Sequence, residues 1–174
     1  KNILEHVSKE LGLQYFKIIK KQTPWLLKKI DNIKINDLIG GSSLVEYNGI
    51  GKISPSSLRY AKVLSDILKL FNKKKFKKIA EIGTGYGGQL LIFDQFMDFS
   101  KYFFFDLKEV LLFCEKYLDS YLLRNSFETL HINNFNGEEE FDLVISNYAF
   151  SELPSKLQEI YLRKVILQSK RGYI

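Results

Sequence analysis

The chain has 174 residues, of which 45% are hydrophobic, which is enough for one domain with a packed core. Its single cysteine, Cys114, excludes a disulfide framework and a cysteine-based zinc site, and two histidines are too few for a histidine-rich metal motif. No apolar run approaches transmembrane length and no signal-peptide pattern opens the chain, so we expect a cytoplasmic protein without membrane insertion. We assign no metal-ligating residues, and the metal dependence of the protein stays open.

The N-terminal 75 residues predict a helical cap before the core. Apolar residues recur there at helical spacing, at Leu4, Val7, Leu11, Tyr15 and Ile18. Residues 36–51 contain four glycines, which predicts a loop that can act as a mobile lid. Ser54 and Pro55 have the residue types of an N-cap and a first helical residue. The apolar face of the helix that follows consists of Tyr60, Val63, Leu64, Ile67, Leu68 and Phe71.

A lysine run at residues 73–78 and the net charge of +6 suggest a nucleic-acid surface. Lysine outnumbers arginine 22 to 4, whereas nucleic-acid surfaces usually also use arginine for bidentate phosphate contacts. The run also lies just before the first predicted strand, at the end of the sheet opposite any ligand. We therefore interpret the run as a solvated turn and expect no nucleic-acid partner.

Residues 76–88 predict a strand, a tight glycine turn and the start of a helix. An apolar strand over 76–82 leads into Gly83, Gly85 and Gly87, and an apolar stretch begins at Leu90. Gly83 can form a sharp turn, Gly85 lets the main chain approach a ligand, and Gly87 or its neighbour lets the helix pack on the strand. This arrangement brings backbone N–H groups close to a nucleotide-like ligand.

The spacing of these glycines, with Gly88, also satisfies the dinucleotide-binding fingerprint, so the spacing alone does not identify the ligand. Glu81 lies two residues before the first glycine, where a carboxylate would repel a pyrophosphate and suits a cationic ligand. A glycine turn without any ligand is a further alternative.

A second strand is predicted over 102–105, ending at Asp106. Asp106 lies 23 positions after Gly83, close to the roughly 20-residue spacing at which an acid binds ribose hydroxyls. The alternative is that Asp106 caps the next helix. The predicted apolar face of that helix consists of Val110, Phe113, Cys114, Tyr117 and Leu118.

The remaining strands follow in the order expected of a parallel sheet. Residues 127–132 predict the third strand, after which Asn133 either recognises an adenine edge or simply forms a turn. Residues 141–153 predict the fourth strand and a loop. Ser155 and Gln158 have the spacing of a capping box, which opens a helix with Leu157, Ile160, Tyr161 and Val165 on its apolar face. Residues 171–174 begin the fifth strand.

The glycine turn and residues 141–153 resemble motifs I and IV of class I S-adenosylmethionine (SAM) methyltransferases. Residues 53–60, 81–88 and 146–153 together are similar to the bacterial sugar O-methyltransferase family, over about residues 40–174. The resemblance implies an α/β, Rossmann-like three-layer sandwich with a mostly parallel sheet. It implies a helical cap over 1–75, a SAM-binding core over 76–174, and methylation of a sugar hydroxyl in surface polysaccharides.

The resemblance also implies the site residues. The cofactor-binding set is Arg59, Glu81, Gly83, Gly85, Tyr86, Gly87, Asp106, Leu107, Asn133 and Asn147. Arg59 either clamps the SAM carboxylate or a substrate oxygen, or forms a surface salt bridge. Tyr86 and Tyr148 either face the sulfonium or pack in the core. Glu152 is the candidate base for the acceptor hydroxyl, the alternative being that it caps the following helix.

Two other classes of function stay open at this point. One is an NAD(P)-binding oxidoreductase, which Glu81 and the motif IV match oppose. The other is a non-catalytic SAM- or nucleic-acid-binding module, favoured only by the lysine run. Class I methyltransferases normally add two more strands after the fifth, and the chain starts at Lys1 rather than Met. We therefore expect the chain to be part of a longer protein.

Overall fold

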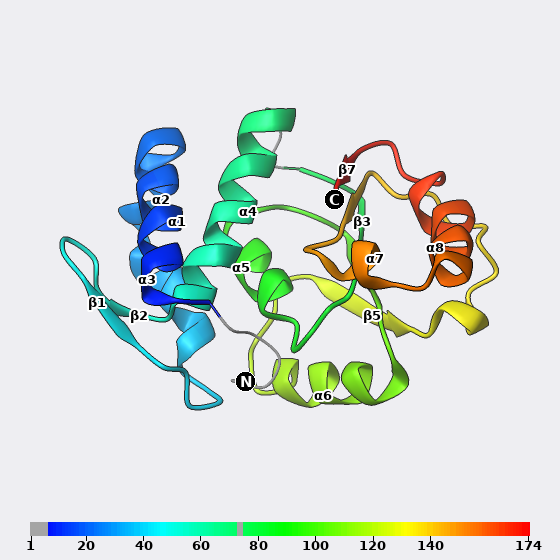
Figure 1. The fold of residues 1–174 in the computed structure, drawn as a ribbon, viewed down its shortest axis with the longest axis horizontal. Helices are drawn as coiled ribbons and strands as arrows, with labels where there is room; N and C mark the ends of the chain where they lie inside the picture. The colour runs from blue at the N-terminus through cyan, green and yellow to red at the C-terminus, as the bar shows by residue number, and fades with distance from the viewer. Residues whose placement is uncertain (1–6, 73–74) are drawn as a thin grey trace. The chain divides into compact units, whose positions relative to one another are not determined.

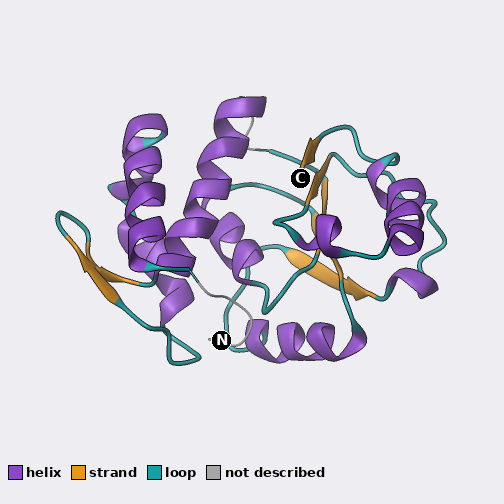
Figure 2. Ribbon diagram, in the orientation of Figure 1, coloured by secondary structure: helices purple, strands orange, loops and turns teal. Residues whose placement is uncertain are grey.

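The computed structural model describes residues 7–72 and 75–174. The chain divides into two compact units, which we call the N-terminal unit (Lys1–Lys74 with Gly88–Phe96) and the sheet unit (Lys75–Gly87 with Met97–Ile174). Figure 1 labels most of the helices and strands of both units, and Figure 2 distinguishes helices from strands. No helix of the described residues is long and apolar enough to cross a membrane.

The sheet unit contains five parallel strands, which confirms the predicted sheet. They are β3 (Lys78–Ile82), β4 (Lys101–Phe105), β5 (Ser126–Leu130), β6 (Leu143–Ile145) and β7 (Gly172–Tyr173). Their spatial order is β5-β4-β3-β6-β7, and every neighbouring pair is parallel. The order therefore reverses between β3 and β6. In open α/β sheets, ligands bind beyond the carboxyl ends of the strands at such a reversal.

Side chains alternate between the two faces of this sheet. Ala80, Phe103 and Val144 belong to a buried cluster with Tyr161 and Val165, which come from α8 (Ser155–Tyr161) and the π-helical turn after it (Leu162–Ile166). The opposite face carries Tyr102 and Thr129, and Thr129 contacts α6 (Lys108–Leu118) through a hydrogen bond to Glu115. Helices thus flank both faces of the sheet. Two shorter elements, 3₁₀ helix η2 (Ile132–Asn134) and α7 (Ala149–Glu152), lie at the carboxyl ends of β5 and β6.

The N-terminal unit is mainly helical. Its elements are α1 (Lys9–Gln22), α2 (Pro24–Leu27), α3 (Ile30–Lys34), η1 (Ile35–Asp37), β1 (Val45–Tyr47), β2 (Gly51–Ile53), α4 (Pro55–Phe71) and α5 (Gly88–Phe96). Ser54 is the N-cap of α4, as predicted, and accepts a hydrogen bond from Ser57 N at 3.1 Å. Asp37 fixes this cap by accepting hydrogen bonds from Ser54 N and from both serine hydroxyls. Residues 36–51 are not only a loop, because β1 and β2 form an antiparallel hairpin.

Three predicted helix details are wrong. The buried face of α1 includes Ile19, whereas Leu11 is 42% exposed; Leu4 lies outside the described residues. In α6, Leu111 is buried and Phe113 is 43% exposed. The prediction failed there because an unbroken apolar run does not reveal which of its residues face inward. The capping box is absent as well. Ser155 is the first residue of α8, and Gln158 donates instead to the Phe150 carbonyl.

Candidate functional site

The glycine turn has the left-handed backbone that its sequence predicts. Gly83, Gly85 and Gly87 have φ angles of 81°, 54° and 88°, which residues with a side chain rarely adopt. A Cβ on Gly83 would collide with the Ala149 methyl of α7, and a Cβ on Gly87 would lie 2.8 Å from Cys114 Sγ of α6. Gly87 therefore makes room for α6, whereas the sequence suggested that it makes room for the helix that directly follows the turn.

Asp106 holds this turn in its shape. Its Oδ2 accepts hydrogen bonds from Thr84 N at 2.7 Å, Thr84 Oγ1 at 3.2 Å and Gly85 N at 3.4 Å. Its Oδ1 accepts from Leu107 N at 2.7 Å. No lysine or arginine of the described residues forms an ion pair with Asp106. A carboxylate offers about four lone-pair directions, so Oδ1 retains capacity for a ligand hydroxyl.

Ser146 fastens α7 beside the same turn. Its buried hydroxyl donates to the Ile82 carbonyl at 3.0 Å and accepts from Phe150 N at 3.0 Å. The serine thus connects the end of β3 to the first turn of α7 and holds Ala149 against Gly83. Tyr148 lies between Ser146 and Ala149 in the chain. Its φ of 74° is a strained conformation for an aromatic residue, and its side chain is 66% exposed.

A pocket of about 230 Å³ opens at the carboxyl ends of β3 and β4. Four of the predicted cofactor residues line it, namely Gly83, Asp106, Leu107 and Asn133. The rest of its wall is largely apolar and comes from β4, η2, α7 and α8, and includes Ala149, Leu153 and Tyr161. No lysine or arginine is among the lining residues.

The other predicted site residues of the sheet unit lie outside this pocket wall. Glu81 is buried on the sheet and accepts a hydrogen bond from Tyr102 Oη at 2.8 Å. Burial and the charge of Glu81 raise the pKa of Tyr102 well above its usual value. Tyr86 is fully buried and packs edge-to-face on Tyr117, with ring centroids 5.0 Å apart, as the packing alternative predicted. Asn147 is half-buried after β6.

Glu152 is the last residue of α7, and its side chain is exposed. In the chain it lies between Ala149 and Leu153, and both of these residues line the pocket. Glu152 does not cap the following helix, because the N-cap of α8 is Pro154 and makes no side-chain cap hydrogen bond. Arg59 belongs to α4 of the N-terminal unit, where its guanidinium lies over the Tyr60 ring, 5.0 Å from the centroid.

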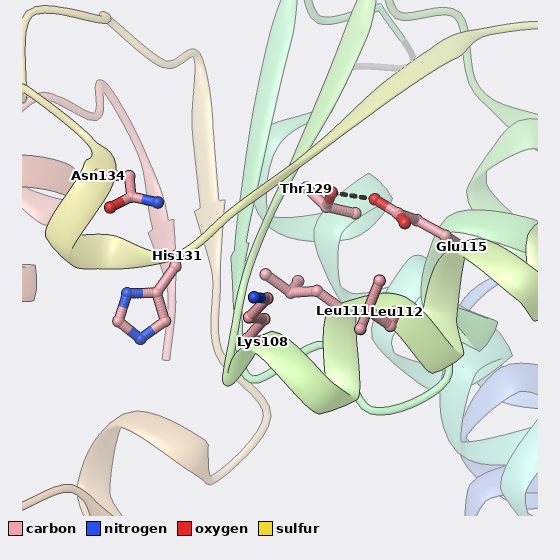
Figure 3. Close-up of a pocket in the computed structure, with 7 residues that line it drawn as sticks. All are labelled: Lys108, Leu111, Leu112, Glu115, Thr129, His131 and Asn134. Atoms are coloured by element: carbon pink, nitrogen blue, oxygen red, sulfur yellow. Dashed lines mark hydrogen bonds between the residues drawn. The ribbon is translucent and has the colours of Figure 1, made fainter.

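A second pocket, of about 360 Å³, lies between α6 and β5 and shares His131 with the first (Figure 3). Lys108, Leu111 and Leu112 approach it from α6, and the hydrogen bond from Thr129 to Glu115 is drawn across one end. His131 Nδ1 accepts from Asn133 N at 3.3 Å. In the neutral ring, Nε2 therefore carries the proton and can donate to a ligand.

Two further observations limit the chemistry of this site. Burial, together with the nearby charge of Glu81, raises the pKa of Cys114 well above its usual value, so the thiol stays protonated and is not a nucleophile. Within residues 7–72 and 75–174, no group of three or more histidine, cysteine, aspartate or glutamate side chains could hold a metal ion.

The fold of the chain is similar to that of several solved structures. A proposed RNA methyltransferase from Pyrococcus horikoshii matches with a TM-score of 0.51 and 18% identity, over 82% of this chain and 69% of that protein. The N-terminal domain of EvdMO1, solved with S-adenosylhomocysteine (SAH) and D-fucose, matches with a TM-score of 0.50 and 13% identity. The chain has the fold of a class I SAM-dependent methyltransferase. The match to EvdMO1 spans 81% of this chain and 59% of the EvdMO1 domain. No protein-family model and no curated protein sequence matches the chain.

Sequence reasoning missed several residues of this methyltransferase fold that shape the pocket. Ser146 and Ala149 lay inside the motif IV stretch but had no assigned role. His131 was counted only in excluding a histidine-rich metal motif, and Tyr161 was placed only on an apolar helix face. Each matters through contacts with residues distant in sequence, and the spacing of one segment carries no signal for such contacts.

Proposed function

We propose that this protein is a SAM-dependent O-methyltransferase that methylates a hydroxyl of a sugar or another small hydroxylated molecule. The observation that carries the proposal is Asp106. Its carboxylate follows β4 directly, holds the Thr84 and Gly85 N–H groups of the glycine turn, and lines a pocket at the strand-order reversal. A carboxylate with free acceptor capacity suits the two hydroxyls of a ribose.

The composition of the pocket favours SAM over a dinucleotide. The 2′-phosphate of NADP needs positive charge, commonly from arginine, and neither lysine nor arginine lines this pocket. A pyrophosphate would also lie near the carboxylate of Glu81, which is buried at the end of β3. The volume of the pocket, about 230 Å³, is below the roughly 300–1,000 Å³ of complete ligand sites. We therefore assign it to the adenosine end of SAM, with Asn133 and His131 as candidates for the adenine edge.

In the proposed mechanism, bound SAM supplies an electrophilic methyl group. Asp106 and the glycine turn would hold the adenosine end of SAM, and this positioning would help to aim the methyl group at the acceptor oxygen. Glu152 would accept the proton of the acceptor hydroxyl as the methyl group leaves the sulfur for the acceptor oxygen. Glu152 suits this role because it is exposed in α7, one residue from Leu153 of the pocket wall.

The sugar acceptor rests on the resemblance of residues 53–60, 81–88 and 146–153 to bacterial sugar O-methyltransferases. EvdMO1, whose N-terminal domain shares the fold, was studied with D-fucose, so deoxyhexoses are the natural first acceptors to test. We also propose that the chain works inside the cytoplasm and has a role in surface polysaccharides. Three lysines at the amino end of the sheet, which could suggest an RNA acceptor, are instead paired with carboxylates. Lys78 pairs with Glu139, Lys101 with Glu128 and Lys170 with Asp142.

Calorimetry with SAM, SAH and NAD tests the cofactor assignment in one experiment. We expect SAM and SAH to bind and NAD not to bind. Methyl transfer from labelled SAM to a panel of hexoses and deoxyhexoses then tests the acceptor. Binding of NAD but not of SAH would overturn the methyltransferase proposal, whereas transfer only to RNA would overturn the small acceptor.

A further inference from the structure

Tyr161 is a polar residue of the pocket wall with no role in the account above. It is the last residue of α8 and only 4% of its surface is exposed. Its ring packs edge-to-face on Phe105, with centroids 6.4 Å apart and an interplanar angle of 88°. Phe105 directly precedes Asp106 in the chain, so this packing fixes the Tyr161 ring beside the strand that carries the carboxylate.

The Tyr161 hydroxyl differs from the bonded polar groups around the turn. Among the described residues it has no hydrogen-bond partner, although the ring is buried and lines the pocket. The hydroxyl oxygen is not one of the buried side-chain atoms that lack a partner, so it keeps contact with solvent and can hydrogen-bond a molecule in the pocket. A structural role alone would be served equally well by phenylalanine.

Asp106 is close enough to influence this hydroxyl without bonding to it. Burial, and secondarily the negative charge of Asp106, raises the pKa of Tyr161 to about 12, so the phenol is neutral near pH 7. The phenol and the carboxylate make no hydrogen bond to each other. Both groups line the same pocket without bonding to each other. A small hydroxylated group can bridge them.

We propose that Tyr161 and Asp106 form a two-point clamp for a vicinal diol, namely the free 2′ and 3′ hydroxyls of the ligand's ribose. Asp106 accepts from one hydroxyl, and the Tyr161 phenol hydrogen-bonds the other. This clamp rests on the proposed function, because it assigns the ribose to this pocket. It also makes Tyr161 a residue that determines specificity for a ribose with free hydroxyls over a ribose with a 2′-phosphate. A 2′-phosphate would meet a carboxylate and a phenol with no lysine or arginine in the wall to neutralise it.

The test uses the whole chain and calorimetry with three probes: SAH, 2′-deoxy-SAH and 3′-deoxy-SAH. Tyr161→Phe keeps the ring and removes only the hydroxyl, so we expect SAH affinity to fall about five- to tenfold. In the wild type, the analogue without the contacted hydroxyl should show a similar loss. Tyr161→Phe should weaken that analogue no further, because hydroxyl and phenol belong to one interaction.

Tyr117→Phe is the matched control. Its hydroxyl contacts Tyr121 Oη at 3.0 Å, and Tyr117 lines neither described pocket, so SAH affinity should stay unchanged. The clamp is overturned if Tyr161→Phe binds SAH like the wild type, or if it weakens all three probes equally. If the variant does not fold, wild-type indifference to both deoxy analogues overturns the clamp instead. Failure of the wild type to bind SAH at all would refute the proposed function.

Discussion

Each end of the sheet has an aspartate that bonds to the main chain, but the two aspartates have different surroundings. At the amino end, Asp142 accepts a hydrogen bond from Lys77 N at 2.6 Å and pairs with Lys170 Nζ at 3.1 Å. At the carboxyl end, Asp106 accepts from Thr84 N at 2.7 Å and has no cationic partner among the described residues. Both aspartates therefore fix the main chain next to β3, one before the strand and the other after it.

Asp142 and Asp106 differ in whether a cation neutralises the charge of the carboxylate. Burial alone would raise the pKa of Asp142, but hydrogen bonds from main-chain N–H groups and the Lys170 ammonium lower it below its usual value. Asp142 is thus a stabilising group whose charge is neutralised by a lysine. Asp106 holds its turn with uncharged donors alone and opens onto a pocket, so part of its acceptor capacity is left for a ligand. The comparison predicts stability effects at one end and binding or rate effects at the other.

The largest effect is expected at the carboxyl end, in Glu152→Gln. This change keeps the size of the side chain but removes the proton acceptor, so turnover should fall roughly 10²–10⁴-fold. SAM affinity should hardly change. Steady-state methyl transfer measures the loss, and Glu159→Gln is the control, because Glu159 is an exposed acid of α8 that pairs with Arg163. A Glu152→Gln enzyme with the wild-type rate would rule out this base.

Gly83→Ala tests how tightly the carboxyl end is packed. The added methyl meets Ala149 and the backbone has a φ of 81°, so the strain should cost about 2–4 kcal/mol in the free energy of unfolding. Gly49→Ala is the control: its φ is 92° but nothing lies within 4 Å of the added methyl. Denaturant unfolding of both variants separates the steric cost from the backbone cost. Equal losses would mean that the contact with Ala149 is unimportant.

The matched pair Asp106→Asn and Asp142→Asn tests the comparison directly. Asp106→Asn removes a charged acceptor of the ribose, so SAH affinity should fall at least tenfold, with a smaller loss of stability from the loosened turn. Asp142→Asn should leave SAH affinity unchanged and lower the free energy of unfolding by about 1–3 kcal/mol. Calorimetry and denaturant unfolding of both variants give the four values. Equal losses of SAH affinity in the two variants would abolish the distinction between the two ends.

The pH dependence of stability sharpens the description of Asp142. Its pKa in the folded chain is lower than in the unfolded chain, where it is about 3.9. Its contribution is therefore complete above about pH 5 and is lost as the pH falls through the folded-state value. The stability difference between wild type and Asp142→Asn should be constant from pH 5 to 7 and shrink at pH 3. A difference that is unchanged at pH 3 would contradict the lowered pKa.

The smallest effect is expected from the lysine run. Replacing Lys73, Lys74 and Lys75 by glutamine should change neither SAH binding nor turnover, since the run precedes the amino end of β3. Lys73 and Lys74 lie outside the described residues. Binding to RNA should be weak and fall steeply with salt. Tight binding that resists salt and is lost in the triple variant would make the amino end a functional surface.

The sequence predicted the frame of this site well because the frame depends on local patterns. Short segments with fixed spacing are enough to recognise the glycine turn, the acid after the second strand and the order of the strands. The buried faces of α1 and α6 were misjudged at Leu11 and Phe113, because several apolar residues competed for the same face. Gln158 was misread because its residue type fits a cap, although tertiary structure offered it the Phe150 carbonyl.

The remainder of the site depends on contacts that no local pattern encodes. Ser146 acts between β3 and α7, and Ala149 sets the limit on residue 83. Tyr161 reaches the pocket only because α8 packs against the sheet face that carries Phe105. Spacing along the chain can place such residues on an element, but only the fold brings them to one pocket.

The π-helical turn Leu162–Ile166 has an evolutionary consequence for Tyr161. Its wide turn is closed by a hydrogen bond from Leu167 N to the Leu162 carbonyl at 2.9 Å, and it holds one residue more than an α-helical turn. Loss of one residue from it would restore a regular helix and rotate everything before it by about 100° relative to Val165. Tyr161 would then leave the pocket while Val165 kept its place in the core. Single-residue length changes in this segment would thus be a route by which descendants of this chain gain or lose a ribose contact without altering the sheet.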